Sequence, residues 1–248
     1  DILHRIFPFS PSCGLLKDEA AALVNQVLRS VSPSLIKLGN PSVHYRLGSV
    51  QRTDAGKTVL QFSASETGSS TVVTEGGLFE PKLPNFIQDE CNILVSKMVQ
   101  SAAVGNSVCL IGQRGEGKSF VSKRFAAALG YVQIETLFLF EDMTARDLLQ
   151  RRSTNSRGES IWEATPLSHA VKRGGLCVLD GLHRLSAGTI SALSRLIQDR
   201  EVTLYDGTRF ISPRRYEYLT KVMNVSVNEL TLRNVHPVHP SFRILGLG

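Results

Sequence analysis

Cysteine is scarce in this sequence, and long apolar runs are missing from it. The four cysteines are Cys13, Cys91, Cys109 and Cys177, and no two of them form the CxxC spacing of a zinc or redox site. Cys109 and Cys177 lie within short apolar runs, so we expect two small buried thiols in a reducing, intracellular compartment. No apolar run approaches the length of a membrane-spanning helix, so we expect no membrane span.

Dense clusters of one charge are also missing. The net charge is +6 and the sequence pI is about 9.3, a balance that is compatible with a nucleic-acid partner. However, the arginine pairs Arg151–Arg152 and Arg214–Arg215 do not extend into longer runs, and basic residues do not alternate with aromatic ones. We therefore favour a basic isoelectric point without a basic site, and keep a nucleic-acid-binding module as the disfavoured alternative.

The 248 residues suffice for one large domain, or for one domain with an appendage. The chain begins without Met and with neither a signal nor a transit peptide, so we expect a piece of a longer protein whose targeting segment is not in view. Three parts differ in pattern. Residues 1–32 have apolar residues at helical spacing, residues 33–83 are β-rich with a hairpin turn at "TDAGK", and strands alternate with helices over residues 84–248.

The third part predicts an α/β fold. Its expected strands are "SVCLIG", "VQIETLFLF", "GGLCVLD" and "SFRILGLG", and we expect the first and third of these to be buried. Helices are expected from Pro84, over residues 118–129, at "TARDLLQ" and "PLSHAVKRG", and at "SAGTISALSRLIQ". "EVTLYDGTRFI" reads as a hairpin that turns at Asp206–Gly207. Alternating strands and helices predict a three-layer sandwich around a mostly parallel sheet.

A phosphate-binding motif lies between the first of these strands and the helix after it. "GQRGEGKS" matches GxxxxGK[ST] in full. Glycine lets successive backbone N–H groups converge on phosphate oxygens, the helix adds its positive end, and the lysine reaches the terminal phosphates. The serine hydroxyl is placed to bind Mg²⁺. The predicted nucleotide-binding residues are Gly112, Gln113, Arg114, Gly115, Glu116, Gly117, Lys118 and Ser119, of which Arg114 and Glu116 occupy variable positions of the motif.

A second strand supplies the acid that such a site needs. Asp180 closes the apolar run of "GGLCVLD", and we predict that it holds Mg²⁺ together with Ser119. In ATPases that activate water from this strand, the next residue is usually glutamate, whereas here it is Gly181. His183 is the nearest titratable base, although a histidine at such a spacing is more often a surface or packing residue. We expect nucleotide binding and slow hydrolysis, and leave the catalytic residue unassigned.

Several segments together resemble the dynein-related branch of AAA+ ATPases, the group that includes midasin and MoxR proteins. They are "EDMTARDLLQRR", "WEATPLSHAVKRGG", "LDGLHRLSAGTISALSRLIQDREVTLYDGTRF" and "HPSFRI", which keep the family's order and spacing from about residue 85 to residue 248. The resemblance implies an AAA+ core that stops at the sensor strand, with the sensor residue at or just past Gly248 and no assignable arginine finger. Asp147 falls on a "DL" position with a structural or neighbour-contacting role.

The same resemblance bears on the rest of the chain and on its function. Residues 1–32 look like the end of a preceding module's helical lid, and residues 33–83 like a connection between modules. A closer resemblance, to a large mitochondrial protein with tandem modules of this kind, implies a mitochondrial location. The implied function is an ATP- and Mg²⁺-binding module of a larger ATPase that works with neighbouring AAA+ modules and remodels a protein partner. A module that holds nucleotide for structural or regulatory purposes, with little hydrolysis, stays open because of Gly181.

Overall fold

The computed structural model describes residues 45–64, 68–84, 89–132 and 134–248. The helical lid predicted for residues 1–32 lies outside the described residues, as does Cys13, so these remain predictions. Most of the described chain belongs to one compact unit, residues 46–62 and 70–248.

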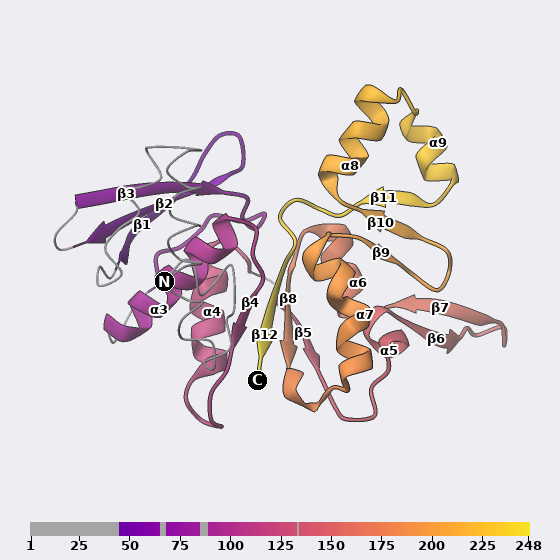
Figure 1. Cartoon of the computed structure of the whole chain (residues 1–248), viewed down its shortest axis with the longest axis horizontal. Coiled ribbons are helices and arrows are strands. Elements are labelled where there is room, and N and C mark those ends of the chain that lie inside the picture. Colours follow the sequence, from indigo (N-terminus) through magenta and orange to yellow (C-terminus); the bar gives the residue numbers. More distant parts are fainter. Residues whose placement is uncertain (1–44, 65–67, 85–88, 133) are drawn as a thin grey trace, which may run out of the picture. The chain divides into compact units, whose positions relative to one another are not determined.

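A four-stranded parallel sheet is the centre of this unit (Figure 1). Its strands run in the order β4 (Val108–Leu110), β12 (Arg243–Leu247), β8 (Leu176–Asp180) and β5 (Ile134–Phe138). All neighbouring pairs are parallel. Since the strands are far apart in sequence and the helices lie between them, the predicted alternation of strands and helices gives a parallel sheet, as expected.

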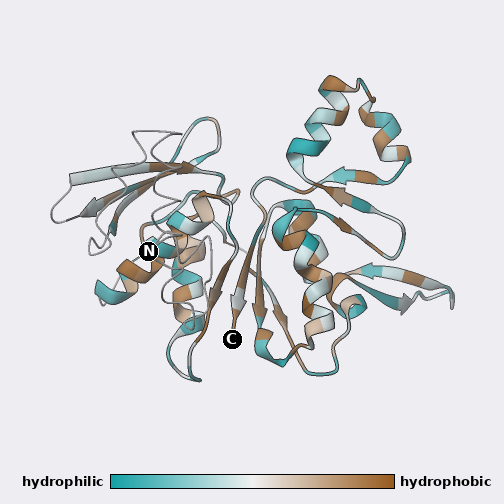
Figure 2. Ribbon diagram, viewed as in Figure 1, coloured by the Kyte–Doolittle hydropathy of each residue, from teal (hydrophilic) through white to brown (hydrophobic). Residues whose placement is uncertain are grey.

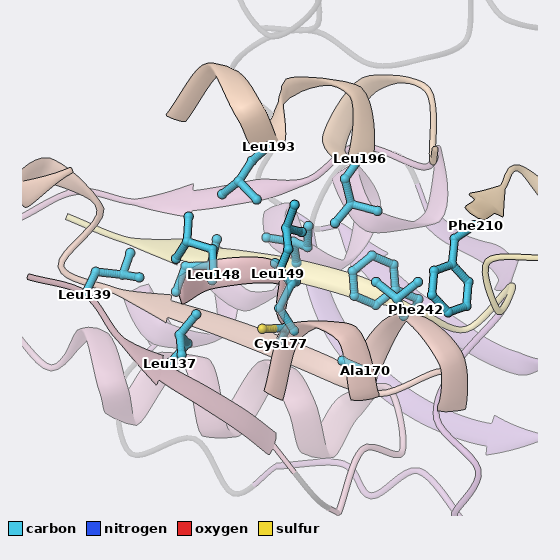
Figure 3. Close-up of a cluster of buried hydrophobic side chains, with 14 of the residues drawn as sticks. Leu137, Leu139, Leu148, Leu149, Ala170, Cys177, Leu193, Leu196, Phe210 and Phe242 are labelled. Atoms are coloured by element: carbon cyan, nitrogen blue, oxygen red, sulfur yellow. The ribbon is translucent and has the colours of Figure 1, made fainter. Parts of the chain in front are cut away.

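β8 is buried on both of its faces, which is typical of a strand inside a sandwich. Leu176, Cys177, Val178 and Leu179 are each at most 3% exposed, and the central strands are largely apolar in Figure 2. On one face, β8 and β5 pack with the helices α5 (Ala145–Leu149), α6 (Pro166–Arg173) and α7 (Ala187–Gln198) into a cluster of buried apolar side chains (Figure 3). The predicted α/β sandwich with a parallel sheet is confirmed.

The helices begin and end at residues with the expected chemistry. α5 (Ala145–Leu149) and α6 (Pro166–Arg173) each start with a capping box, with Thr144 and Thr165 at their N-caps. α7 (Ala187–Gln198) is capped by Ser186, whose hydroxyl accepts a hydrogen bond from the Thr189 N–H at 3.2 Å. The two remaining long helices of the described chain are α3 (Asp89–Ala103) and α4 (Lys118–Ala128).

Two hairpins and a helical insertion extend from the sheet. β9 (Val202–Thr203) and β10 (Arg209–Ile211) are antiparallel and turn at Asp206–Gly207, which confirms the predicted hairpin. The pattern did not predict the hairpin of β6 (Gln150–Thr154) and β7 (Ser160–Ala164). It also missed the insertion between β10 and β11 (Val235–Pro237), which contains α8 (Pro213–Glu217), the π-helical turn η3 (Tyr218–Val222) and α9 (Val227–Leu232).

The β-rich segment forms a separate sheet of β1 (Arg46–Arg52), β2 (Thr58–Ala64) and β3 (Gly68–Thr74). Its first turn lies at "TDAGK" as predicted, with Gly56 at φ 77°. The proline-containing stretch that follows packs against the end of α4, where the Lys82 N–H donates to the Ala127 carbonyl at 2.9 Å. The Gly77 N–H bonds the Leu129 carbonyl at 2.7 Å, and a Cβ on Gly77 would lie 2.1 Å from the Gly130 carbonyl oxygen. Glycine therefore permits this close backbone approach.

The prediction that "SVCLIG" is a buried strand with a buried thiol is wrong. β4 has only three residues, Cys109 is exposed, and Ile111 is 86% exposed. Within the described residues β4 pairs with β12 on one side only, so its backbone and side chains are covered less than those of β8. Cys177, on the doubly covered β8, is buried as predicted, and burial raises the pKa of its thiol to about 12.

Candidate functional site

The predicted phosphate loop and the predicted magnesium ligand lie at the same edge of the parallel sheet. The last residues of the four strands align in one row across the sheet: Leu110 pairs with Leu247, Leu247 with Asp180, and Asp180 with Phe138. Only β12 separates β4 from β8, so the ends of these two strands are about 10 Å apart. Parallel pairing therefore brings together two motifs that lie about seventy residues apart in sequence.

Residues 111–117 form the loop between β4 and α4, and two of its glycines adopt a left-handed conformation. Gly115 has φ 94° and Gly117 has φ 81°, and a Cβ built on either residue would meet nothing within 4 Å. Glycine is therefore favoured at these two positions by the left-handed backbone, and not by crowding from neighbouring atoms. No other part of the described chain crowds these two glycines.

Lys118 holds the base of the loop. Its amine donates to the carbonyl oxygens of Gly112 at 2.5 Å and Gln113 at 2.8 Å. The Glu116 carboxylate accepts a hydrogen bond from the Gln113 N–H at 2.7 Å, so this variable motif position braces the same turn. The side chains of Lys118 and Glu116 thus hold the loop in its shape.

The start of α4 has no side-chain cap. Gly117 is its N-cap residue and offers no side-chain oxygen, and the first helical bond runs from the Val121 N–H to the Gly117 carbonyl at 3.0 Å. The N–H groups of the first turn, at Lys118, Ser119 and Phe120, precede that bond, so the helix leaves these donors at its positive end without a capping group. Ser119 is exposed there. This arrangement is suited to an anion at the helix start.

Asp180 is half-buried at the end of β8, and its carbonyl accepts a hydrogen bond from the Leu139 N–H at 2.8 Å. A carboxylate oxygen and a serine hydroxyl are the hard oxygen ligands that Mg²⁺ prefers, usually beside water and substrate phosphates. The donor set of Ser119 and Asp180 therefore fits Mg²⁺. Gln113, Arg114 and Glu116 are exposed around the loop, where their side chains can border a ligand.

Gly181 occupies the position at which a water-activating glutamate is usual, and its backbone is left-handed with φ 91° and ψ 32°. A Cβ here would lie 3.1 Å from the Leu139 carbonyl oxygen and 3.4 Å from Cδ of Arg184. Both the conformation and the surroundings therefore disfavour any side chain at this position. The Asp-Gly pair after a strand is a sequence signal for such a turn.

The other candidates have structural explanations. His183 is exposed on a short 3₁₀ helix, η2 (Leu182–Arg184), and no hydrogen bond joins it to the phosphate loop among the described residues. Asp147 belongs to the capping box of α5, where its carboxylate accepts hydrogen bonds from the Thr144 hydroxyl at 2.6 Å and the Thr144 N–H at 3.0 Å. These bonds lower the pKa of Asp147. This capping role of Asp147 is structural, which is one of the two roles that the family resemblance implies for it.

An aromatic and cationic contact joins the two hairpins. The rings of Trp162, on β7, and Tyr205, at the β9–β10 turn, stack with centroids 5.7 Å apart. The Arg146 guanidinium of α5 lies 5.2 Å from the centre of the Tyr205 ring. Sequence reasoning missed this contact, although the "NSRGE" turn between β6 and β7 is a hairpin signal that could have led to it.

No helix in the described part of the chain has the length and the apolar composition of a membrane span.

One family model and several known proteins are similar to this chain. The model of the AAA domain (dynein-related subfamily) matches residues 107–247. Von Willebrand factor A domain-containing protein 8 of Mus musculus is 48% identical over 154 residues, which cover 62% of this chain and 8% of that protein. Protein NorQ of Paracoccus denitrificans is 33% identical over 112 residues, or 44% of this chain and 41% of that protein. The crystal structure of NtrX from Brucella abortus aligns with a TM-score of 0.38 at 14% identity, over 64% of this chain and 38% of that one. This chain thus spans less than half the length of each of them.

Proposed function

Because the chain belongs to the AAA domain family, in its dynein-related subfamily, we propose that it is an ATP-binding module of a larger ATPase. One observation carries the proposal: an open glycine loop, braced by Lys118, leads into the uncapped start of α4 at the sheet edge that also bears Asp180. Loops of this kind hold phosphates through backbone N–H groups and the helix dipole.

The residues have separate roles in this proposal. The N–H groups from Gly115 to Ser119 bind the phosphates, and Lys118 gives charge to the terminal ones. Ser119 and Asp180 hold Mg²⁺, which neutralises phosphate charge when it is bound. Positioning and charge stabilisation are most of what phosphoryl transfer requires from a protein, and these residues would supply both to a bound nucleotide.

The whole protein's work is part of the proposal. By resemblance to its family, the module acts with neighbouring AAA+ modules and couples ATP binding and hydrolysis to the remodelling of a protein partner. The mitochondrial location also rests on resemblance. A nucleic-acid partner has less support, because exposed basic residues of the helical insertion are paired: Arg215 with Glu201, Lys221 with Glu217 and Arg233 with Glu229.

A second candidate function is a module that holds ATP with little hydrolysis. The observation that favours it is the left-handed backbone at Gly181, which is strained for any residue with a Cβ and would place that Cβ 3.1 Å from the Leu139 carbonyl oxygen. Under this candidate, the larger protein hydrolyses ATP at other modules, and this site stabilises or regulates the assembly. The two candidates share the binding chemistry and differ in turnover.

Binding is tested by titrating the chain with Mg-ATP in a calorimeter. Lys118→Ala should weaken binding at least tenfold, because the positive charge that the lysine places beside the terminal phosphates is lost. Lys123→Ala, an exposed lysine on the same helix, is the matched control and should bind as the wild type does. Equal affinity of the two variants would remove the proposal.

Turnover separates the two candidate functions. ATP hydrolysis is measured for the longer protein that carries this module, with and without Lys118→Ala. A large loss of rate in the variant supports hydrolysis at this site. A rate equal to that of the wild type, together with weakened ATP binding by the module, supports the nucleotide-holding candidate.

A further inference from the structure

Two arginines meet at the opposite, amino edge of the sheet, where β12 begins. Nη1 of Arg200 donates to the Phe242 carbonyl oxygen at 2.6 Å, and Nη1 of Arg243 donates to the same oxygen at 2.9 Å. One neutral acceptor thus holds two guanidinium groups close together. The Arg200 guanidinium also lies 5.5 Å from the centre of the Phe242 ring.

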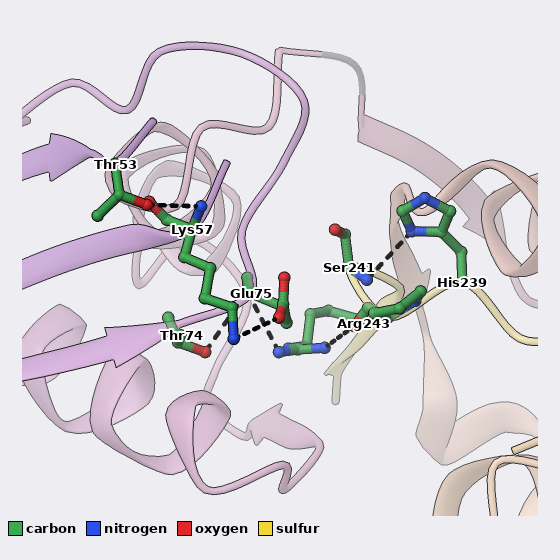
Figure 4. Close-up of polar contacts among 8 residues, drawn as sticks. Thr53, Lys57, Thr74, Glu75, His239, Ser241 and Arg243 are labelled. Carbon is green, nitrogen blue, oxygen red and sulfur yellow. Dashed lines mark hydrogen bonds and ion pairs between the residues drawn. The ribbon is translucent and has the colours of Figure 1, made fainter. Parts of the chain in front are cut away.

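No carboxylate balances these two charges among the described residues. Neither arginine forms an ion pair there. Glu75 is the acid beside them, but its carboxylate pairs with Lys57 at 3.3 Å and it offers Arg243 only its backbone carbonyl, at 3.2 Å (Figure 4). Arg243 is 7% exposed, and its Nε has no hydrogen-bond partner. Buried cationic groups normally have such partners.

The charges act on each other. Burial and the charge of Arg243 lower the pKa of Arg200 to about 10. Arg200 also has a left-handed backbone, φ 57°, just after the end of α7, at a position where glycine is the usual residue. Arg200 thus has both an unfavourable backbone conformation and a neighbouring charge of the same sign. Such a combination is typical of residues with a functional role and not only a structural one.

A cavity of about 240 Å³ adjoins the pair and is lined by Arg200, Pro213, Val238, His239 and Pro240. Arg243 lies behind this wall and donates to the Pro240 carbonyl at 2.8 Å. Nδ1 of His239 accepts a hydrogen bond from the Ser241 N–H at 3.1 Å, so Nε2 of the neutral imidazole carries the proton and is a donor. The remaining walls are apolar.

We propose that this cavity binds a small oxyanion, with Arg200 and His239 as direct donors and Arg243 as a buried positive charge behind them. The shared chemistry is that of phosphate or of a carboxylate. Such a ligand would supply the negative charge that the described residues lack. The site lies at the amino edge of the sheet, so it is distinct from the phosphate loop and does not depend on the proposed nucleotide function.

Equilibrium dialysis with labelled inorganic phosphate tests the site, with chloride as the supporting ion at constant ionic strength. The full chain carrying Lys118→Ala is used, so that the phosphate loop contributes little. We expect about one bound phosphate per chain. A parallel series with labelled acetate shows whether a carboxylate is accepted in its place.

Arg200→Gly is the informative variant. Glycine suits the backbone at φ 57°, so the variant should fold, which a thermal melt checks. It should lose phosphate binding at least tenfold. Arg214→Gln, which removes a charge from an exposed arginine of the nearby α8, is the control and should bind like its parent.

A second readout is the His239 imidazole, followed by NMR over pH. Burial lowers its pKa, and the charge of Glu75 raises it. A bound anion favours the protonated ring, so phosphate should raise this pKa relative to chloride, and Arg200→Gly should abolish the increase. No bound phosphate in the Lys118→Ala chain, or equal binding by Arg200→Gly, would overturn the proposal.

Discussion

The phosphate loop and the turn after β8 contain glycines in nearly the same conformation but in opposite surroundings. Gly117 and Gly181 have φ of 81° and 91°. At Gly117 a Cβ would meet nothing within 4 Å, whereas at Gly181 it would lie 3.1 Å from a backbone carbonyl oxygen. A side chain at the first position would have free space, whereas a side chain at the second would be crowded by the backbone.

This difference distinguishes two reasons for a left-handed glycine. In the proposed phosphate loop, glycine would let backbone N–H groups point at a ligand. After β8, glycine lets the chain turn tightly beside the Leu139 carbonyl, and a side chain at this position would be strained. One half of the proposed site thus has the features of a phosphate loop, while the other half has a left-handed glycine where a glutamate is usual.

The largest expected effect follows from placing a carboxylate at the closed position. Gly181→Glu should destabilise the chain by about 2 kcal/mol, since a left-handed non-glycine backbone is strained and its Cβ is crowded. It should also leave ATP turnover without an increase, because the strained turn does not aim the carboxylate. Urea unfolding and an ATPase assay measure both effects.

Gly188→Glu is the matched control, because it adds the same charge on an exposed residue of α7 with space for a Cβ. Its stability should stay within about 0.5 kcal/mol of the wild type. A tenfold gain in turnover by Gly181→Glu at unchanged stability would contradict the closed character of the position.

A smaller effect on stability is expected at the open position. Gly117→Ala should cost about 1 kcal/mol, from backbone strain alone, but should weaken Mg-ATP binding because the loop can no longer point its N–H groups freely. Gly105→Ala has the same kind of strain, with φ 86° and open space, at a turn away from the loop. Gly105→Ala should lose about the same stability and bind Mg-ATP with the wild-type affinity. An equal loss of Mg-ATP affinity in both variants would contradict a specific role of Gly117 in binding.

The smallest effect concerns the side chain that covers Gly181. Arg184→Ala in a Gly181→Ala background should recover only a few tenths of a kcal/mol, because the nearest obstacle is the Leu139 carbonyl and not Arg184. Urea unfolding of the two single variants and the double variant measures this coupling. Recovery of most of the lost stability would mean that a mobile side chain, and not the backbone, closes the position.

Much of the fold could be predicted because its signals are local. The periodic pattern of α7, the capping residues of α5 and α6, and the Asp206–Gly207 turn each depend on neighbours within a few residues. The burial of β4 could not be predicted, because an apolar triplet has the same sequence pattern at the edge of a sheet and in its centre. Cys109 was therefore expected inside and is exposed.

By itself, the sequence determined the phosphate motif, the presence of Asp180 on a second strand and the absence of glutamate beside it. The tertiary structure decided where these residues meet, since parallel pairing aligns Leu110, Leu247 and Asp180 in one row. It also decided that Gly181 is closed and that Arg200 and Arg243 share one acceptor. Motifs are read from adjacent residues, whereas alignment, crowding and charge pairing depend on segments that only folding brings together.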